Sequence, residues 1–172
     1  MLGAGDVSIE RRLRMTNSEP GLGSSVLAYT GYYLGLAVLL NIVLWVSETY
    51  AGVVISSSAV GWMPPIMGAM AAGQRYGKLA GRKASGGYAW AASFGFLVVS
   101  VLLSVGLLAG FAAYLGIDMM AEIKLVVKDL ARDQISLTII ASVLGGFLLL
   151  LWVLMRFGFN YGAGLSVKAV KL

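Results

Sequence analysis

The chain has 172 residues, of which 59% are hydrophobic and only 12% are charged. Soluble domains average about 45–50% apolar and about 25% charged residues, so this composition excludes an ordinary water-soluble globular domain. The sequence contains no cysteine and no histidine. Disulfides, thiolate nucleophiles, histidine-ligated haem and zinc sites that need Cys or His are therefore excluded as well.

The formal net charge of +5 does not predict a nucleic-acid partner. Basic residues stand in short connections beside apolar runs, and no nucleic-acid recognition motif interleaves with them. This placement is typical of the charge bias that orients membrane spans.

Residues 1–25 are polar and rich in glycine and predict a cytoplasmic N-terminal tail. Arg11, Arg12 and Arg14 lie in this tail. The apolar run that follows is long enough to span a membrane and has no obvious signal-peptide cleavage site. We therefore expect it to be retained as a membrane anchor.

Four apolar runs predict an all-α fold, namely an integral membrane four-helix bundle. About 20 apolar residues cross a hydrocarbon core about 30 Å thick. The expected spans are residues 26–46, 51–72, 89–116 and 135–157, which form a membrane domain over 26–157. Residues 158–172 are expected to be a cytoplasmic C-terminal tail.

Two glycine pairs in these spans have the GxxxG spacing that lets membrane helices approach closely. They are Gly31 with Gly35, and Gly106 with Gly110. We predict that these glycines pack helices together. Asn41 is expected to bond to a neighbouring helix through its amide, and a serine face in the third span is expected to point into the bundle.

Pro64 and Pro65 interrupt the second predicted span. Proline lacks the backbone N–H and clashes with the preceding turn. The pattern predicts a helix kink, or a break with a new helix starting at Pro64. Broken spans build substrate sites in some transporters, but no ionisable residue lies near this break, so we favour an ordinary kink.

The connection at residues 74–88 contains the densest basic cluster of the chain and no acidic residue. We expect a flexible cytoplasmic hairpin that orients the spans, and a candidate contact for anionic lipids or a partner. Its basic residues are Arg75, Lys78, Arg82 and Lys83. The segment lacks the GxxxxGK[ST] pattern of a phosphate-binding loop, so nucleotide binding is not predicted.

Residues 117–134 predict a short external amphipathic helix, because Met120, Ile123, Val127 and Leu130 recur at helical spacing. We expect it on the outer membrane surface; docking onto another protein is the alternative. Ten of the thirteen Lys and Arg residues then lie on the opposite side. This bias predicts that both termini are cytoplasmic.

The second span ends in Ala72-Gly73-Gln74-Arg75-Tyr76, and Gly81-Arg82 and a span led by Trp90 follow. Over residues 26–157 the chain resembles the ABZJ-type family of small four-span bacterial inner-membrane proteins. The resemblance implies a multi-pass protein of the bacterial inner membrane and implies no activity.

Arg156 lies at the inner end of the fourth span and is assigned to the C-terminal tail. Apart from it, the spans contain no Asp, Glu, Lys, Arg or His. We therefore predict a protein that is not an enzyme and has no cofactor. The expected function is that of an accessory, structural or assembly subunit of a larger membrane complex. The alternative is a homo-oligomeric pore or transporter-like protein, as in holins. The expected partners are membrane lipids, and a larger complex or further copies of this chain.

Overall fold

The computed structural model describes residues 19–52, 61–132 and 134–169, and every regular element in these ranges is an α-helix. The all-α prediction is confirmed for these residues. Most of the expected N-terminal tail, with its three arginines, lies outside them. The helices are α2 (Leu22–Ala51), α4 (Met63–Ala80), α5 (Gly86–Tyr114), α6 (Met119–Arg132) and α7 (Gln134–Ala169).

Three helical segments are long and apolar enough to cross a membrane, which supports the prediction of an integral membrane protein. They are Leu22–Ala51, Gly86–Tyr114 and Leu137–Ala169. The predicted span at residues 51–72 has no counterpart among them. Its first part falls largely outside the described residues, and its second part forms the start of α4, so a fourth span stays a prediction.

The prediction of a flexible hairpin over residues 74–88 is wrong for most of these residues, because they are helical. Helix α4 continues to Ala80 and ends at Gly81, whose φ of 63° is the left-handed conformation that glycine adopts readily. Ser85 then caps α5, because its hydroxyl accepts a hydrogen bond from the Tyr88 backbone N–H at 3.3 Å. The connection is therefore reduced to residues 81–85.

The predicted end of the last helix at residue 157 is also wrong. Helix α7 continues to Ala169, so the segment assigned to a C-terminal tail is helical over residues 158–169. Phe159 and Ala163 in this segment are fully buried. Packing against the other helices stabilises the extension, although Asn160 and Lys168 interrupt its apolar character.

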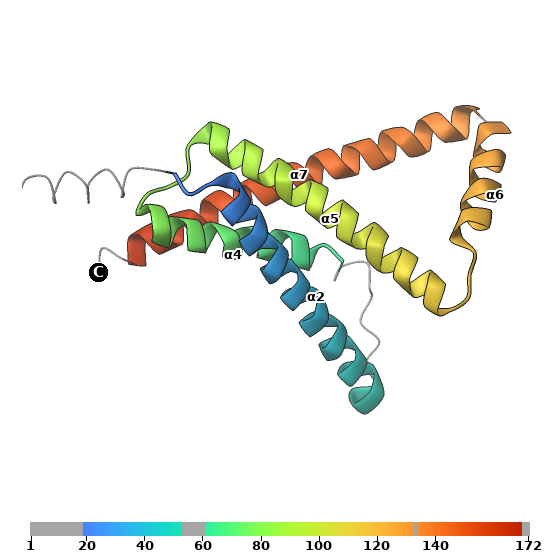
Figure 1. Ribbon diagram of the computed structural model, residues 1–172, viewed down its shortest axis with the longest axis horizontal. Helices are drawn as coiled ribbons and strands as arrows, with labels where there is room; N and C mark the ends of the chain where they lie inside the picture. The colour runs from blue at the N-terminus through green and yellow to red at the C-terminus, as the bar shows by residue number, and fades with distance from the viewer. Residues whose placement is uncertain (1–18, 53–60, 133, 170–172) are drawn as a thin grey trace, which may run out of the picture.

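The helices alternate in direction along the chain, as Figure 1 shows. Helices α2 and α5 run one way, and α4 and α7 run the opposite way. The four helices pack together at one end only, and the distal parts of α2, α5 and α7 diverge beyond it. A four-helix bundle packed along its whole length is therefore not observed.

Aromatic rings from four helices form the core of the packed end. The rings of Tyr29 and Phe96 stack with centroids 4.4 Å apart. Phe159 meets Phe96 edge to face at 5.5 Å and meets Tyr76 at 5.5 Å. All four side chains are at most 1% exposed, so this cluster joins α2, α4, α5 and α7 in one apolar core.

Close backbone contact between α4 and α7 depends on two facing GxxxG pairs, Gly73 with Gly77 and Gly158 with Gly162. A Cβ on Gly73 would lie 2.0 Å from the carbonyl oxygen of Phe159. A Cβ on Gly162 would lie 2.0 Å from the carbonyl oxygen of Met70. Only glycine fits at these two positions, because the obstructing atoms belong to the backbone.

The glycine pairs predicted to pack helices do not do so within this chain. A Cβ added at Gly31, Gly35, Gly106 or Gly110 would meet no described atom within 4 Å. These four positions lie in the parts of α2 and α5 that face away from the packed helices. The close helix contact in this fold does use the GxxxG spacing, but at the glycine pairs of α4 and α7 and not at the predicted pairs.

Helix α6 confirms the predicted helix at residues 117–134 with slightly narrower limits. The Asp118 carboxylate accepts hydrogen bonds from the backbone N–H groups of Met120 and Ala121, at 3.0 and 3.1 Å, and so caps its start. Met120, Ile123 and Val127 of the apolar stripe are exposed. Helix α6 spans the gap between the separated ends of α5 and α7 (Figure 1).

We predict that Gly73→Ala and Gly162→Ala each destabilise the folded protein by about 1–3 kcal/mol, the usual range for overpacking a tight contact. Gly31→Ala and Gly106→Ala are matched controls, because their added methyl groups meet open space. Unfolding in mixed micelles of increasing denaturing detergent, followed by circular dichroism, measures the difference. Equal stability of all four variants would contradict the glycine-dependent contact.

Candidate functional site

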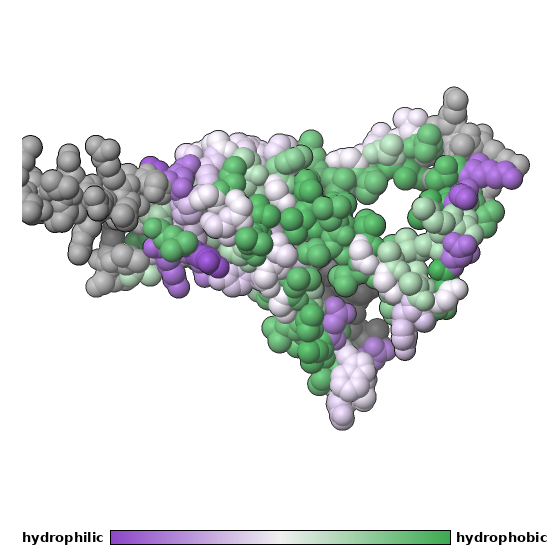
Figure 2. Space-filling view, viewed as in Figure 1, coloured by the Kyte–Doolittle hydropathy of each residue, from purple (hydrophilic) through white to green (hydrophobic). Residues whose placement is uncertain are grey.

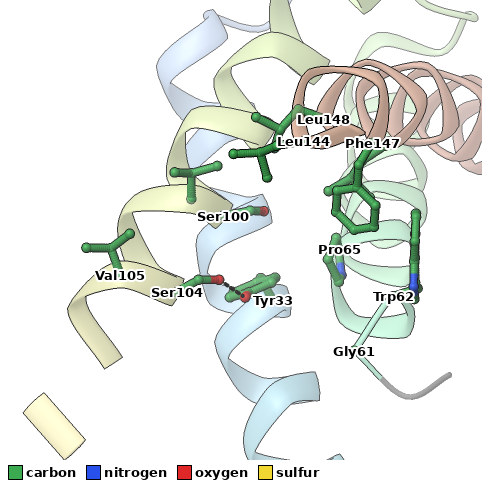
Figure 3. Close-up of a pocket in the computed structure, with 12 residues that line it drawn as sticks. Tyr33, Gly61, Trp62, Pro65, Ser100, Ser104, Val105, Leu144, Phe147 and Leu148 are labelled. Atoms are coloured by element: carbon green, nitrogen blue, oxygen red, sulfur yellow. Dashed lines mark hydrogen bonds between the residues drawn. The ribbon is translucent and has the colours of Figure 1, made fainter. Parts of the chain in front are cut away.

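A cavity lies where the helices begin to diverge, and Figure 3 shows it between α2, α4, α5 and α7. Its volume is about 470 Å³. Its walls are mainly apolar: Trp62, Pro65, Val101, Val105, Leu144, Phe147, Leu148 and Leu151, with Gly61, Tyr33, Ser100 and Ser104. It is large enough for a small apolar ligand or part of a lipid chain.

Hydroxyl groups line one side of this cavity. The hydroxyls of Tyr33 and Ser104 are hydrogen-bonded at 3.3 Å, as Figure 3 shows, and that of Ser100 is hydrogen-bonded to Tyr29. The expected burial of the serine face is confirmed for Ser93 and Ser100, whereas Ser104 is exposed at the cavity. No Asp, Glu, Lys or Arg is among the described residues that line the cavity, so these walls suit an apolar ligand better than an ion.

The two prolines lie at the start of a helix and do not kink one, and one of them, Pro65, lines the cavity. Helix α4 begins at Met63, so Pro64 and Pro65 occupy its first turn, where a missing N–H breaks no helical hydrogen bond. Pro65 lines the cavity beside Trp62, whose ring lies 4.2 Å from that of Phe147. The described residues show no kink at the two prolines. Residues 53–60, which lie before α4, are outside the described part of the chain.

The basic residues at the end of α4 and in the α4–α5 connection do not form one cluster. Arg82 approaches Glu19, with 4.0 Å between Nη2 and Oε1. Arg75 borders a shallow groove on the α2 side, together with Pro20 and Ser24. Lys83 extends over Gly164 of α7, so the predicted contact surface is divided between two sides of the molecule.

Glu19 fastens the segment before α2 to the α4–α5 connection. Its Oε1 accepts hydrogen bonds from the Ser85 backbone N–H at 3.2 Å and from the Tyr76 hydroxyl at 3.3 Å. Burial by itself raises the pKa of Glu19, but the Ser85 and Tyr76 hydrogen bonds and the Arg82 charge outweigh it. The net effect lowers the pKa below its ordinary value of 4.5.

Sequence reasoning missed the position of Arg156, which it assigned to the tail. Arg156 lies within α7, and its guanidinium carbon is 4.4 Å from the ring centroid of Trp90. The indole N–H of Trp152 donates to the Trp90 carbonyl at 3.4 Å, and the two rings meet at 4.8 Å. This cation–π contact places a positive charge against aromatic rings of α5 and α7.

Asn160 follows Arg156 at a spacing of four residues on the same helix. The Arg156 Nε and the Asn160 Oδ1 are buried and have no hydrogen-bond partner among the described atoms. The spacing of four residues continues through Gly164 to Lys168, so these residues lie along one side of α7. This spacing was visible in the sequence, but it was not considered because residues 158–172 were expected to be a tail.

Asn41 also differs from expectation. Its amide donates to the carbonyl of Ala37 in its own helix at 2.8 Å, whereas a bond to a neighbouring helix was predicted. The side chain borders a groove between α2 and α5, whose other wall includes Leu107. Its polar group is therefore exposed beside apolar side chains of the diverging helices.

In the described part of the chain, no group of three or more Asp and Glu side chains is placed to hold a metal ion. The fold and its three apolar segments define an all-helical protein of the membrane class. No known family model, curated protein or solved structure matches the chain. The resemblance to the ABZJ-type family accordingly stays a prediction.

We predict that Glu19→Gln detaches the segment before α2 at neutral pH. The lowered pKa means that ionised Glu19 stabilises the fold above about pH 4.5, and that this contribution is lost as the pH falls through the folded-state pKa. Hydrogen exchange at the Ser85 amide should be faster in the variant. In the natural protein, the protection of this amide relative to its intrinsic exchange rate at the same pH should be lost only as Glu19 is protonated in acid, and an identical pH profile of protection for both proteins would refute this role.

Proposed function

We propose that this chain is a non-catalytic accessory, structural or assembly subunit of a larger membrane complex. The observation that supports it best is that the uncovered apolar surface of the diverging helices is accompanied by open glycine pairs. Leu102 of α5 and Val143 of α7, for example, are 65% and 67% exposed. Figure 2 displays the apolar surface that continues over these segments.

Exposed apolar side chains alone are equally compatible with contact to lipid. Two further features on α2 and α5 favour a protein partner. The open glycine pairs, Gly31 with Gly35 and Gly106 with Gly110, leave room for another helix to approach. Asn41 presents an amide to the same region, and a partner helix can satisfy such a group better than lipid does.

The proposed location is the bacterial inner membrane, with both termini in the cytoplasm. The alternation of helix directions supports this orientation, because it places Arg75, Lys78, Arg82, Lys83 and Lys168 at one end of the molecule. Lys124 and Lys128 of α6 lie at the other end. An excess of Lys and Arg marks the cytoplasmic side, so the packed end is assigned to the cytoplasm.

A homo-oligomeric pore or transporter-like protein is the second candidate. The cavity beside Pro65, with the hydroxyls of Tyr33, Ser100 and Ser104 on one wall, favours it. Assembly of several copies through the diverging segments could extend this polar wall into a path. The lack of lining ionisable groups makes this candidate less well supported, because transport pathways usually contain them.

We predict that the tagged chain copurifies with a stoichiometric partner complex after extraction in mild detergent. Gly35→Leu and Gly106→Leu should lose at least nine-tenths of that partner while retaining normal helicity, because both positions are open within the chain. Gly23→Leu is the matched control, since it is also open but outside the paired glycines. Quantitative mass spectrometry of the purified material measures the ratio.

Recovery of a homo-oligomer that leaks ions from liposomes would instead support the pore and would contradict the accessory function. In that case the glycine variants should alter the oligomeric state and the ion flux together.

We also predict that alkaline phosphatase is active when fused after Glu48 or Glu122, and inactive when fused after Lys168. The enzyme folds only outside the cytoplasm, so its activity reports the side on which each position lies. β-Galactosidase fusions at the same sites should give the opposite pattern. An inactive phosphatase fusion at either glutamate would refute the proposed orientation.

A further inference from the structure

A small groove on the packed end lies between the α4–α5 connection and the last turns of α7. Its volume is about 120 Å³, and its lining residues are Lys83, Asn160, Tyr161, Gly164, Leu165 and Lys168. Two ammonium groups from distant parts of the sequence thus border one recess. Like charges in a shared groove repel each other, and a bound anion relieves that repulsion.

Gly164 allows Lys83 to enter this groove. The Lys83 Cε would lie 3.3 Å from a Cβ at position 164, and its Nζ 4.0 Å away. The lysine side chain therefore lies directly against the α7 backbone. A larger residue at position 164 would displace the ammonium group without changing the charge of the chain.

The lining is amphiphilic, which distinguishes the groove from a site for a free inorganic anion. Lys83, Lys168 and the Asn160 amide supply the polar part, whereas Leu165 and the Tyr161 ring supply an apolar side. Tyr161 is 63% exposed and Leu165 is 38% exposed, so both face the surroundings of α7. The Asn160 side chain lines the same groove, and its amide is a polar group that can hydrogen-bond to a headgroup hydroxyl.

We propose that this groove binds the headgroup of an anionic phospholipid. The phosphate lies between the ammonium groups of Lys83 and Lys168, a headgroup hydroxyl bonds to Asn160, and the acyl chains run along Leu165 and Tyr161 into the membrane. The site rests on the proposed contact between the basic connection and membrane lipids. It does not depend on the identity of any partner complex.

The division of the basic residues supports a local site over a diffuse positive surface. Arg82 lies beside Glu19, and Arg75 borders the opposite groove near α2. Neither lines the Lys83–Lys168 groove. Lys78 is exposed on α4 and does not line it either, so Lys78 provides a control for the loss of one positive charge at the same end of the molecule.

The test uses the full chain in nanodiscs of equal parts phosphatidylglycerol and phosphatidylcholine, followed by native mass spectrometry of the lipids that stay bound. Lys83→Gln and Lys168→Gln should each reduce phosphatidylglycerol retention roughly fivefold, the factor that corresponds to about 1 kcal/mol per basic residue. Gly164→Leu should reduce it similarly with unchanged charge. Lys78→Gln should retain the natural preference.

An equal loss in Lys78→Gln would overturn the proposal in favour of unspecific attraction, and unchanged retention in both groove lysine variants would overturn it outright. Displacement of the lipid by millimolar inorganic phosphate would identify a free-anion site instead. Unchanged circular dichroism and elution volume confirm that each variant is folded. Partner recovery in the copurification experiment is read separately, so failure of the lipid site is distinguishable from failure of the proposed function.

Discussion

Close contact between the backbones of α4 and α7 determines how the rest of the molecule is arranged. Four glycines allow this contact, and carbonyl oxygens of Met70 and Phe159 occupy the space that side chains would need. The contact holds Phe159 where it meets Phe96 and Tyr76. Through Phe96 the same cluster reaches Tyr29, so α2 and α5 are positioned indirectly by glycines on the other two helices.

Helices α2 and α5 are joined by a different kind of interaction. Tyrosine and serine hydroxyls pair across them: Ser25 with Tyr88 at 2.8 Å, Tyr29 with Ser100, and Tyr33 with Ser104 at 3.3 Å. The successive pairs run from the packed end to the cavity. Where they stop, the two helices lose contact and the apolar surface of each is exposed, so the extent of these pairs coincides with the extent of packing.

The apolar runs and their periodicity predicted α2, α5, α6 and most of α7, because long hydrophobic segments and an amphipathic stripe are local signals. The packing was not predictable in the same way. The predicted second and fourth spans end at residues 72 and 157, close to the charged residues Arg75 and Arg156, whereas charge indicates only where a helix leaves an apolar environment. Gly73 and Gly162 therefore lie outside the predicted spans, and the glycines predicted to pack helices are those in the more apolar segments.

The two ends of the molecule consequently differ in what they can bind. At the packed end, aromatic rings of four helices form a buried core, and two basic residues contact neighbouring segments: Arg82 approaches Glu19, and Lys83 lies against the α7 backbone. This is the end at which we propose that a phospholipid headgroup binds. At the diverging end, apolar side chains, open glycines and Asn41 offer a long surface with little internal packing. The proposed helical partner would pack along this surface and supply contacts that the described part of this chain does not make within itself.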